Sequence, residues 1–288
     1  MQFGERLAGA MRQWGPLCVG IDPHPSLLSQ WGLPDTAESL LAFGDAVIEA
    51  SVRSAAAVKP NAAFFERHGA RGIAALERIL GNAKEQGLIT ILDAKRGDIG
   101  STMEAYADAY LRPGAPLEAD AITVSPYLGF GSLAPALELA ERNDKGLFVL
   151  ALTSNAEGAS VQHAVGADGP VARAVAEAAA ELNSAQLKRG AKPMGSVGLV
   201  VGATIGDAVT ELGIDLAAVN GPLLAPGVGA QGATPADVAK VFGTATSRVL
   251  VSQSRGVLQA GPFVEKLRGA IQAAAGAAAY ILAPADEE

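Results

Sequence analysis

The sequence predicts a closed (β/α)8 barrel, and two observations support this fold class. Eight short apolar runs of β character alternate along the chain with segments of helical periodicity. Most of the runs are apolar almost throughout, which is typical of parallel strands covered on both faces. This alternation favours a closed barrel, with a doubly wound open sheet as the alternative. The predicted strands are Leu17–Asp22, Ala56–Lys59, Leu88–Lys95, Ala121–Ser125, Leu147–Thr153, Val197–Val201, Leu223–Gly227 and Val249–Ser252.

Helix start signals lie between the predicted strands. Ser101 and Glu104 fit a capping box, in which the side chain of each residue bonds to the backbone of the other. Thr234, Pro235 and Asp237 fit an N-cap, a proline at the first helical position and an acid in the first turn. Both patterns place a helix directly after a strand, as the barrel requires.

Composition limits the classes of function. The chain has 288 residues, of which 49% are hydrophobic and 18% charged, so it can bury a large core and is not a disordered chain. Its formal charge of −8 makes binding to nucleic acid through phosphate neutralisation a poor hypothesis. No linker or shift in composition divides the chain, so we expect one domain over residues 1–288.

The apolar run Ala270–Ala283 is shorter than the ~20 residues that span a bilayer, so we expect a buried terminal helix and no membrane partner. The lone Cys18 cannot form a disulfide within the chain, and the N-terminal stretch does not resemble a signal peptide. Both observations favour a reducing, cytoplasmic location.

Polar residues recur where the predicted strands end. In a closed barrel these ends meet at one rim, which is where active sites are built. One charged residue at a strand end is usually solvated or paired, but several together indicate function. The residues in question are Asp22, Lys59, Asp93, Lys95, Ser125, Thr153, Gly227 and Arg255.

The densest group is the run Asp93–Asp98, which reads Asp-Ala-Lys-Arg-Gly-Asp. Asp93 and Lys95 are two residues apart on a strand, so we expect them on the same face. Carboxylates beside Lys95 favour its ammonium form, which gives a positioned proton donor. Lys59, at the end of another strand, could join this array. The structural alternative is an ion-pair network that closes the barrel.

A glycine-rich run, Pro226–Gly232, follows the seventh predicted strand and leads into the helix at Pro235. Glycines let backbone N–H groups approach an anion, and a helix N-terminus favours negative charge. Arg255 follows the eighth strand and can hold phosphate oxygens. The loops after these two strands are the recurrent phosphate site of this architecture.

Two further features carry less information. His24, His68 and His163 show no metal-ligand spacing and no arrangement with serine and aspartate, so we expect surface or structural roles and no metal site. The segment Ser154–Pro170 is much longer than a usual connection of ~2–6 residues. It is either a mobile lid or a tolerated insertion.

The chain resembles the orotidine 5′-phosphate decarboxylase family, and most closely its bacterial type 2 branch. Three segments carry the resemblance, namely Asp93–Thr102, Lys59–Glu66 and Thr153–Asn155. It runs from Phe3 to about Leu258. The resemblance implies the decarboxylation of orotidine 5′-monophosphate to uridine 5′-monophosphate, in pyrimidine nucleotide synthesis, without a metal or an organic cofactor. The long loop after the fifth strand departs from the compact members of the family.

The resemblance also implies roles for the charged residues. Lys95 would protonate C6 of the pyrimidine as carbon dioxide leaves, and Asp93 would face the departing carboxylate and orient Lys95. Lys59 and Asp98 would complete the charged array. Asp98 and Thr102 would reach into the site of a second subunit, which implies a homodimer.

The same resemblance assigns the remaining contacts to the substrate. Asp22 would hold the ribose hydroxyls, and Ser125 would contact the pyrimidine. Gly227, Gln231 and Arg255 would hold the phosphate.

Two other functions compete with this one. A magnesium-dependent sugar-phosphate decarboxylase or aldolase would share the D-x-K-x-x-D pattern of Asp93–Asp98. Activity that survives EDTA would argue against it. A non-catalytic nucleotide-binding barrel is the second alternative, because a fold does not determine a function. Tight product binding without turnover would support it.

Overall fold

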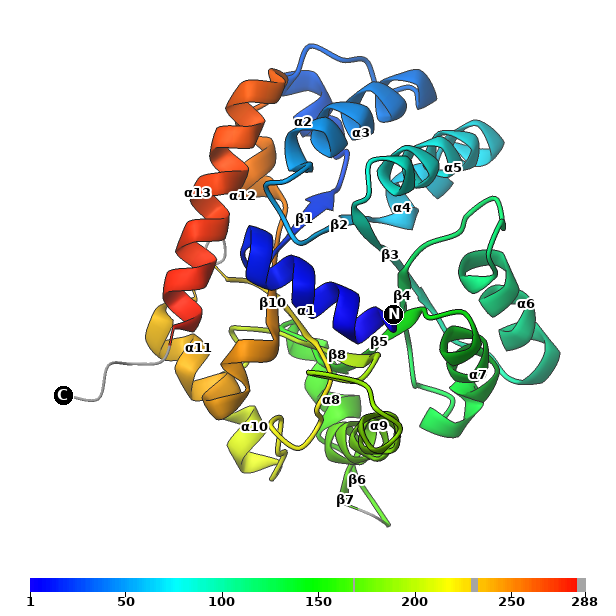
Figure 1. The fold of residues 1–288 in the computed structure, drawn as a ribbon, viewed down its shortest axis with the longest axis vertical. Helices are drawn as coiled ribbons and strands as arrows, with labels where there is room; N and C mark the ends of the chain where they lie inside the picture. Colours follow the sequence, from blue (N-terminus) through cyan, green and yellow to red (C-terminus); the bar gives the residue numbers. More distant parts are fainter. Residues whose placement is uncertain (168, 229–232, 284–288) are drawn as a thin grey trace.

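The computed structural model describes residues 1–167, 169–228 and 233–283, and at its centre eight parallel strands form a closed barrel (Figure 1). Around the barrel the strands follow the order β1-β10-β9-β8-β5-β4-β3-β2. The predicted fold class is therefore confirmed, and each predicted strand is found, with no end displaced by more than one residue. The strands are β1 (Leu17–Ile21), β2 (Ala57–Pro60), β3 (Ile89–Arg96), β4 (Ala121–Val124), β5 (Gly146–Leu152), β8 (Val197–Val201), β9 (Leu223–Pro226) and β10 (Val249–Gln253).

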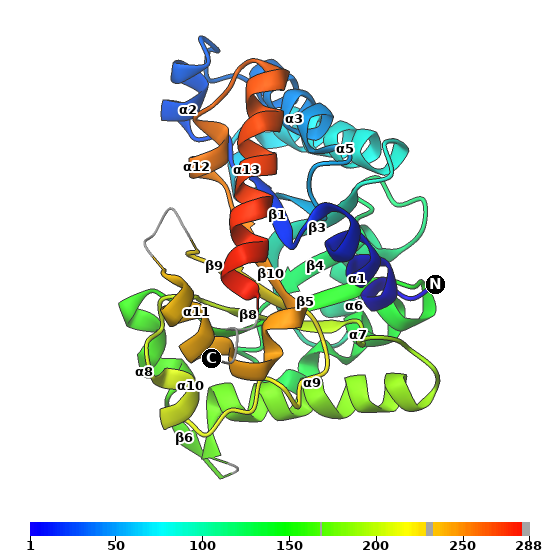
Figure 2. The same ribbon diagram turned by 60° about the vertical axis from the view of Figure 1, so that its left-hand side comes forward.

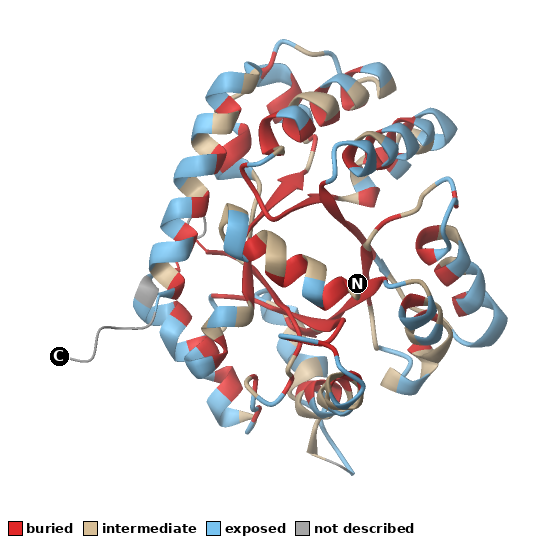
Figure 3. Cartoon of the chain, in the orientation of Figure 1, coloured by how far each residue is buried: buried red, intermediate tan, exposed pale blue. Residues whose placement is uncertain are grey.

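Helices surround the barrel and cover its outer face, so the strands are buried while the helices are exposed on their outer sides (Figure 3). A small antiparallel pair, β6 (Val165–Gly166) with β7 (Gly169–Pro170), lies outside the barrel. The helices are α1 (Phe3–Trp14), α2 (Pro25–Gln30), α3 (Ala37–Ser51), α4 (Ala62–Glu66), α5 (Gly69–Glu85), α6 (Gly100–Leu111), α7 (Ala134–Arg142), α8 (Ala159–Gln162), α9 (Val171–Lys188), α10 (Ala208–Glu211), α11 (Pro235–Phe242), α12 (Arg255–Leu258) and α13 (Val264–Leu282), with 3-10 turns at Phe130–Leu133, Ala156–Gly158 and Gly243–Arg248.

The terminal helix α13 is longer and more exposed than the sequence indicated. Leu267, Ile271 and Ala278 are among the residues that bury one face of it, whereas Tyr280 is 79% exposed. The expectation of a buried helix is therefore wrong for its outer face. Exposure of the small alanine side chains on that face to solvent costs little. Among the described residues, no helix has both the length and the apolar composition needed to cross a bilayer.

The two predicted capping boxes have different outcomes. At α11 the prediction is confirmed, because Thr234 and Asp237 bond to each other's backbone N–H groups at 2.8 and 3.2 Å. At α6 it is wrong, since the helix begins at Gly100 and its N-cap is Ile99, which has no capping side chain. The loop before α6 packs tightly against the residue that follows β4, because a Cβ at Gly97 would lie 2.4 Å from the Ser125 carbonyl oxygen.

Helix α1 closes the N-terminal end of the barrel, and α2, α8 and α11 lie on the other side (Figure 2). Phe3 and Leu7 are fully buried, and the ring of Phe3 meets that of Phe148 on β5 edge-on, with centroids 6.1 Å apart. These side chains form a core inside the barrel together with strand residues such as Cys18 and Ile91. The sequence did not indicate this closure.

Charged residues fasten α1 to the base of the barrel. Arg6 forms an ion pair of 2.7 Å with Asp120, which also accepts hydrogen bonds from the backbone and hydroxyl of Thr90 on β3. Beside this pair, Lys145 and Glu118 are mostly buried and 2.7 Å apart. The base of the barrel therefore contains ion pairs in which each charge compensates the burial of its partner.

Replacing Glu118 with glutamine should destabilise the protein most at neutral pH. Burial alone would raise the pKa of Glu118, but hydrogen bonds from Lys145, Lys84 and the Gly114 amide lower this pKa to about 2. A carboxyl group whose pKa falls on folding stabilises the folded state above its unfolded pKa, and this stabilisation is lost as the pH falls toward the folded pKa. We expect Glu118→Gln to lower the free energy of unfolding by ~1–3 kcal/mol near neutral pH, and the deficit to shrink below about pH 4.3.

Urea unfolding at a series of pH values from neutral down to about 3, below the unfolded pKa of a glutamate, measures this deficit. Glu85→Gln is the control, because Glu85 is exposed and has no ion pair among the described residues. A deficit that stayed constant with pH would contradict a role for the Glu118 charge.

Candidate active site

A pocket of about 490 Å³ opens at the C-terminal ends of the barrel strands. This volume is in the usual range for small-molecule sites. The structure brings six of the predicted site residues together in its wall, from both halves of the chain. They are Asp22, Lys59, Asp93, Lys95, Gly227 and Arg255.

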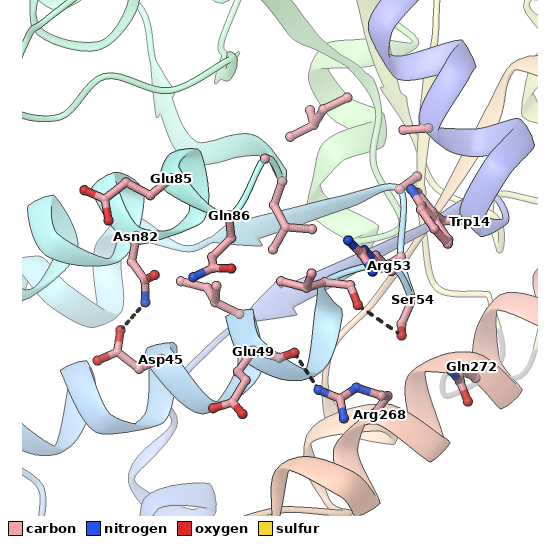
Figure 4. A pocket seen from close by; sticks show the side chains of 18 residues that line it. Trp14, Asp45, Glu49, Arg53, Ser54, Asn82, Glu85, Gln86, Arg268 and Gln272 are labelled. Atoms are coloured by element: carbon pink, nitrogen blue, oxygen red, sulfur yellow. Dashed lines mark hydrogen bonds between the residues drawn. The ribbon is translucent and has the colours of Figure 1, made fainter.

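A larger pocket, of about 1070 Å³, lies at the opposite end between α1, α3, α5 and α13 (Figure 4). Several of its polar groups are satisfied by neighbours, as where Asn82 donates to Asp45 and Arg268 donates to the Glu49 carbonyl oxygen. None of the predicted site residues lines it. Because active sites of this fold lie at the C-terminal face, the smaller pocket is the candidate site.

Asp93 is the centre of the charged array. Its Oδ2 accepts a hydrogen bond of 2.8 Å from Lys59 Nζ, and its Oδ1 accepts one of 2.6 Å from Lys95 Nζ. The side chains of Lys59 and Asp93 are about one-tenth exposed, whereas that of Lys95 is 51% exposed. Lys95 therefore carries its charge at the boundary between the buried array and the pocket.

The buried groups of the array hold each other in the charged form. Burial alone would raise the pKa of Asp93, but Lys59 and Lys95 outweigh it and bring this pKa well below its usual range. Burial would lower the pKa of Lys59, but attraction to Asp93 and Asp22 raises it above its usual value. Beneath them, burial raises the pKa of the Cys18 thiol to about 12, so this cysteine stays protonated, as a structural residue does.

The backbone around Lys95 does not follow the regular strand that the sequence indicated. Lys95 has φ 48°, and the pairing of β3 with β4 shifts register between Leu92 and Arg96. The Lys95 N–H donates instead to the hydroxyl of Thr123, at 3.0 Å. Thr123 lines the pocket, and we did not identify it from the sequence, where it is one of several apolar or hydroxyl residues in a strand.

The first strand contributes a carboxylate and a histidine to the pocket. Asp22 has a buried Oδ1 without a hydrogen-bond partner among the described residues, so this oxygen is available to a ligand. His24 packs its ring on Phe64 at 4.2 Å and also lines the pocket. His24 therefore lies at the candidate site, two residues after Asp22 in the sequence.

The far side of the pocket suits an anion. Gly227, with φ 97°, and Val228 follow β9, and Arg255 begins the turn after β10. Arg255 is exposed and has no ion pair among the described residues. Gln231 lies outside the described residues. The charged residues of the described pocket wall are three cations, Lys59, Lys95 and Arg255, and two carboxylates, so the site is locally positive in an acidic protein.

Three predicted residues do not line this pocket in one chain. The Asp98 carboxylate accepts from the Ile99 N–H at 2.8 Å, and Thr102 is exposed on α6. The Ser125 N–H donates to the Arg96 carbonyl oxygen at 2.8 Å, which places Ser125 at the edge of the site. Asp98 and Ser125 follow β3 and β4 on loops, whereas Thr102 is on α6.

The long segment after β5 is fastened to the strand end. Gln162 on α8 accepts from the Thr153 N–H at 3.0 Å and donates to the Thr153 hydroxyl at 2.7 Å. That hydroxyl donates to Asn155, and Thr153, Ser154 and Asn155 all line the pocket. Between a mobile lid and a tolerated insertion, these contacts indicate a third role, in which the segment braces the pocket wall.

The family model for the orotidine 5′-phosphate decarboxylase / HUMPS family matches residues 15–270. The chain belongs to this family. A protein named orotidine 5′-phosphate decarboxylase from Salinispora arenicola is 57% identical over 269 residues, which are 93% of this chain and 94% of that protein. A relative of the same name from Streptomyces coelicolor is 55% identical over 93% of this chain and 94% of its own length. The resemblance found in the sequence is thus confirmed.

Solved structures agree with this family membership. A crystal structure from Streptomyces avermitilis has 54% sequence identity and a TM-score of 0.90, and the match covers 97% of this chain and 96% of that one. The OMP decarboxylase of Leishmania donovani has 34% identity and a TM-score of 0.75, with 98% and 99% covered.

Replacing Gln162 with alanine should loosen the wall of the pocket. The change removes both hydrogen bonds to Thr153, each of which contributes ~0.5–1.5 kcal/mol. We expect proteolytic cleavage within residues 154–170 to become about tenfold faster, because cleavage of a folded protein follows the population of locally opened forms. Limited proteolysis with identification of the cleavage sites measures this effect.

Ser160→Ala is the matched control, because Ser160 is also on α8 but bonds to the Glu157 carbonyl oxygen within the segment. Equal cleavage rates for the Gln162 variant and the parent protein would show that Gln162 does not brace the wall.

Proposed function

We propose that this chain catalyses the decarboxylation of orotidine 5′-monophosphate to uridine 5′-monophosphate. The observation that carries the proposal is the array Lys59–Asp93–Lys95 at the mouth of the barrel, in a chain that belongs to the orotidine 5′-phosphate decarboxylase / HUMPS family. Lys95 is at once paired with a carboxylate and half exposed to the pocket, which is the arrangement that a proton donor requires.

The substrate fits the distribution of charge along the pocket. Its phosphate would lie against the Gly227 backbone and Arg255, with Gln231 as a further contact, and its ribose would bond to the free oxygen of Asp22. The pyrimidine would then extend toward Lys95, with Ser125 at its edge. Phosphate contacts of this kind, remote from the reacting bond, supply binding energy that aligns the ring.

The reaction breaks the bond between C6 of the pyrimidine and its carboxylate carbon. The electron pair of this bond stays on C6 as carbon dioxide leaves, and the Lys95 ammonium then gives its proton to C6. A fixed ammonium stabilises the charge that develops on C6 more than it stabilises the substrate, which lowers the barrier. Asp93 faces the departing carboxylate and, together with Lys59, holds Lys95 in place.

We further propose a homodimer in which Asp98 and Thr102 complete the site of the second subunit. Both residues lie on the loop and helix after β3, outside the pocket of their own chain. Large apolar side chains are exposed on the same loop and on the next one, with Ile99 62%, Tyr127 77% and Leu128 51% exposed. Exposed apolar groups beside a site favour burial in an interface.

Replacing Lys95 with alanine should abolish turnover without loss of the fold. Loss of the proton donor and of its charge should lower kcat by roughly 10³-fold or more. The decrease of the orotate absorbance in the ultraviolet measures turnover, and calorimetry with uridine 5′-monophosphate measures binding, which should be retained. Lys188→Ala is the control, because Lys188 is exposed on α9. Turnover near the parent level would contradict the assignment of Lys95.

The same assay with EDTA distinguishes the alternative functions. Turnover both with and without EDTA supports the reaction proposed here, whereas turnover only without EDTA favours a magnesium-dependent activity. Binding of uridine 5′-monophosphate without any turnover by the parent protein would favour a binding protein.

Mixing two inactive variants should restore part of the activity. Lys95→Ala keeps Asp98, and Asp98→Ala keeps Lys95, so a mixed dimer contains one intact site. With random exchange of subunits about half of the dimers are mixed, which gives about a quarter of the parent activity. Activity no greater than that of the two variants measured apart would mean that each chain builds its site alone.

A further inference from the structure

Thr123 is a buried hydroxyl residue at the point where β3 and β4 diverge. It is 1% exposed as a residue, yet it lines the wall of the pocket. Its hydroxyl accepts the backbone N–H of Lys95 at 3.0 Å and donates to Asp93 Oδ1 at 2.9 Å. One hydroxyl group therefore connects the backbone of the proposed proton donor to the carboxylate that pairs with its ammonium.

The first of these bonds compensates for an irregular strand. Leu92 is paired with Ile122 and Arg96 with Val124, so four steps along β3 correspond to two along β4. Within this bulge Lys95 has φ 48°, a left-handed conformation that is unfavourable for a residue with a side chain. The Thr123 hydroxyl accepts the Lys95 N–H in the middle of the bulge, next to a buried strand where an unpaired donor is costly.

The second bond orients the carboxylate of Asp93. Among the described residues it has three donors, and two of them are ammonium groups at the ends of long side chains, which can follow the carboxylate if it turns. The Thr123 hydroxyl is fixed more firmly, because a β-branched side chain on a buried strand has little torsional freedom. Of the donors to Asp93, Thr123 is thus the rigid one, and it bonds to the same oxygen as Lys95.

We propose that Thr123 is a positioning residue, which holds Lys95 in its left-handed conformation and fixes the Asp93 oxygen that receives the Lys95 ammonium. Thr123 takes no part in the proton transfer itself and acts through these two residues. The proposal rests on the decarboxylase function proposed above and adds a residue to it. It requires a hydroxyl at this position, which valine lacks and serine provides.

Steady-state kinetics of Thr123→Val and Thr123→Ser tests the proposal. Valine keeps the shape and branching of threonine but leaves the Lys95 N–H and one site on Asp93 without a partner. We expect kcat of Thr123→Val to fall about 10- to 100-fold, as for loss of a hydrogen bond to a charged group, while KM and the Kd for uridine 5′-monophosphate change less than about threefold. Thr123→Ser should retain kcat within about threefold of the parent value.

Thr90 provides a matched control at the opposite end of the barrel. It is a buried strand threonine whose hydroxyl accepts the Asp120 N–H at 3.0 Å and donates to the Asp120 carboxylate at 3.2 Å. Thr90→Val therefore removes the same pair of bonds away from the site. We expect it to lower Tm about as much as Thr123→Val does, with kcat unchanged.

The outcomes separate this proposal from the proposed function. A parent protein that does not decarboxylate orotidine 5′-monophosphate overturns the function itself. A parent protein that turns over, with a Thr123→Val variant of equal kcat, overturns the role of Thr123 alone. Equal losses of kcat in Thr123→Val and Thr90→Val, or failure of Thr123→Ser to retain activity, would reduce Thr123 to a packing residue.

Discussion

The rest of the site depends on the burial of the Asp93 carboxylate. Removing a carboxylate from water costs several kcal/mol unless it is paired and fully hydrogen-bonded. In the part of the chain that the structure describes, Asp93 has three donors, which come from β2, β3 and β4 as Lys59, Lys95 and Thr123. Three neighbouring strands must therefore have the correct register before the charge is tolerated, and the same requirement places the Lys95 ammonium at the pocket.

Closure of the barrel brings the charged array to the residues suited to bind phosphate. The array belongs to the strands from the first part of the chain, whereas Gly227 and Arg255 follow β9 and β10 near its end. These groups share one pocket because β1 pairs with β10 on one side and with β2 on the other. In an open doubly wound sheet the first and last of these strands need not be neighbours, and the cations would not converge.

The sequence was sufficient where a local pattern decides the outcome. Apolar runs indicated each barrel strand, and the positions of Lys59, Asp93 and Lys95 at strand ends indicated the array. The sequence was insufficient where contacts between residues far apart in the chain determine the structure. Thr123 looks like any strand threonine until the bulge at Lys95 faces it, and the pattern Ser101–Glu104 did not show that α6 begins at Gly100. The bracing of Thr153 by Gln162 likewise depends on a fold within a long segment.

The closure of the barrel base by α1 has a consequence for the order in which the chain can fold during synthesis. Helix α1 precedes its packing partners by a long stretch of chain, because Phe3 packs against Phe148, and the Gly4 N–H bonds to the hydroxyl of Ser196, 192 residues later. The apolar face of α1 therefore has no packing partner until most of the barrel has been synthesised. Chains with such long-range contacts fold slowly and expose aggregation-prone surface meanwhile. Helix α1 is thus made well before the strands on which it docks.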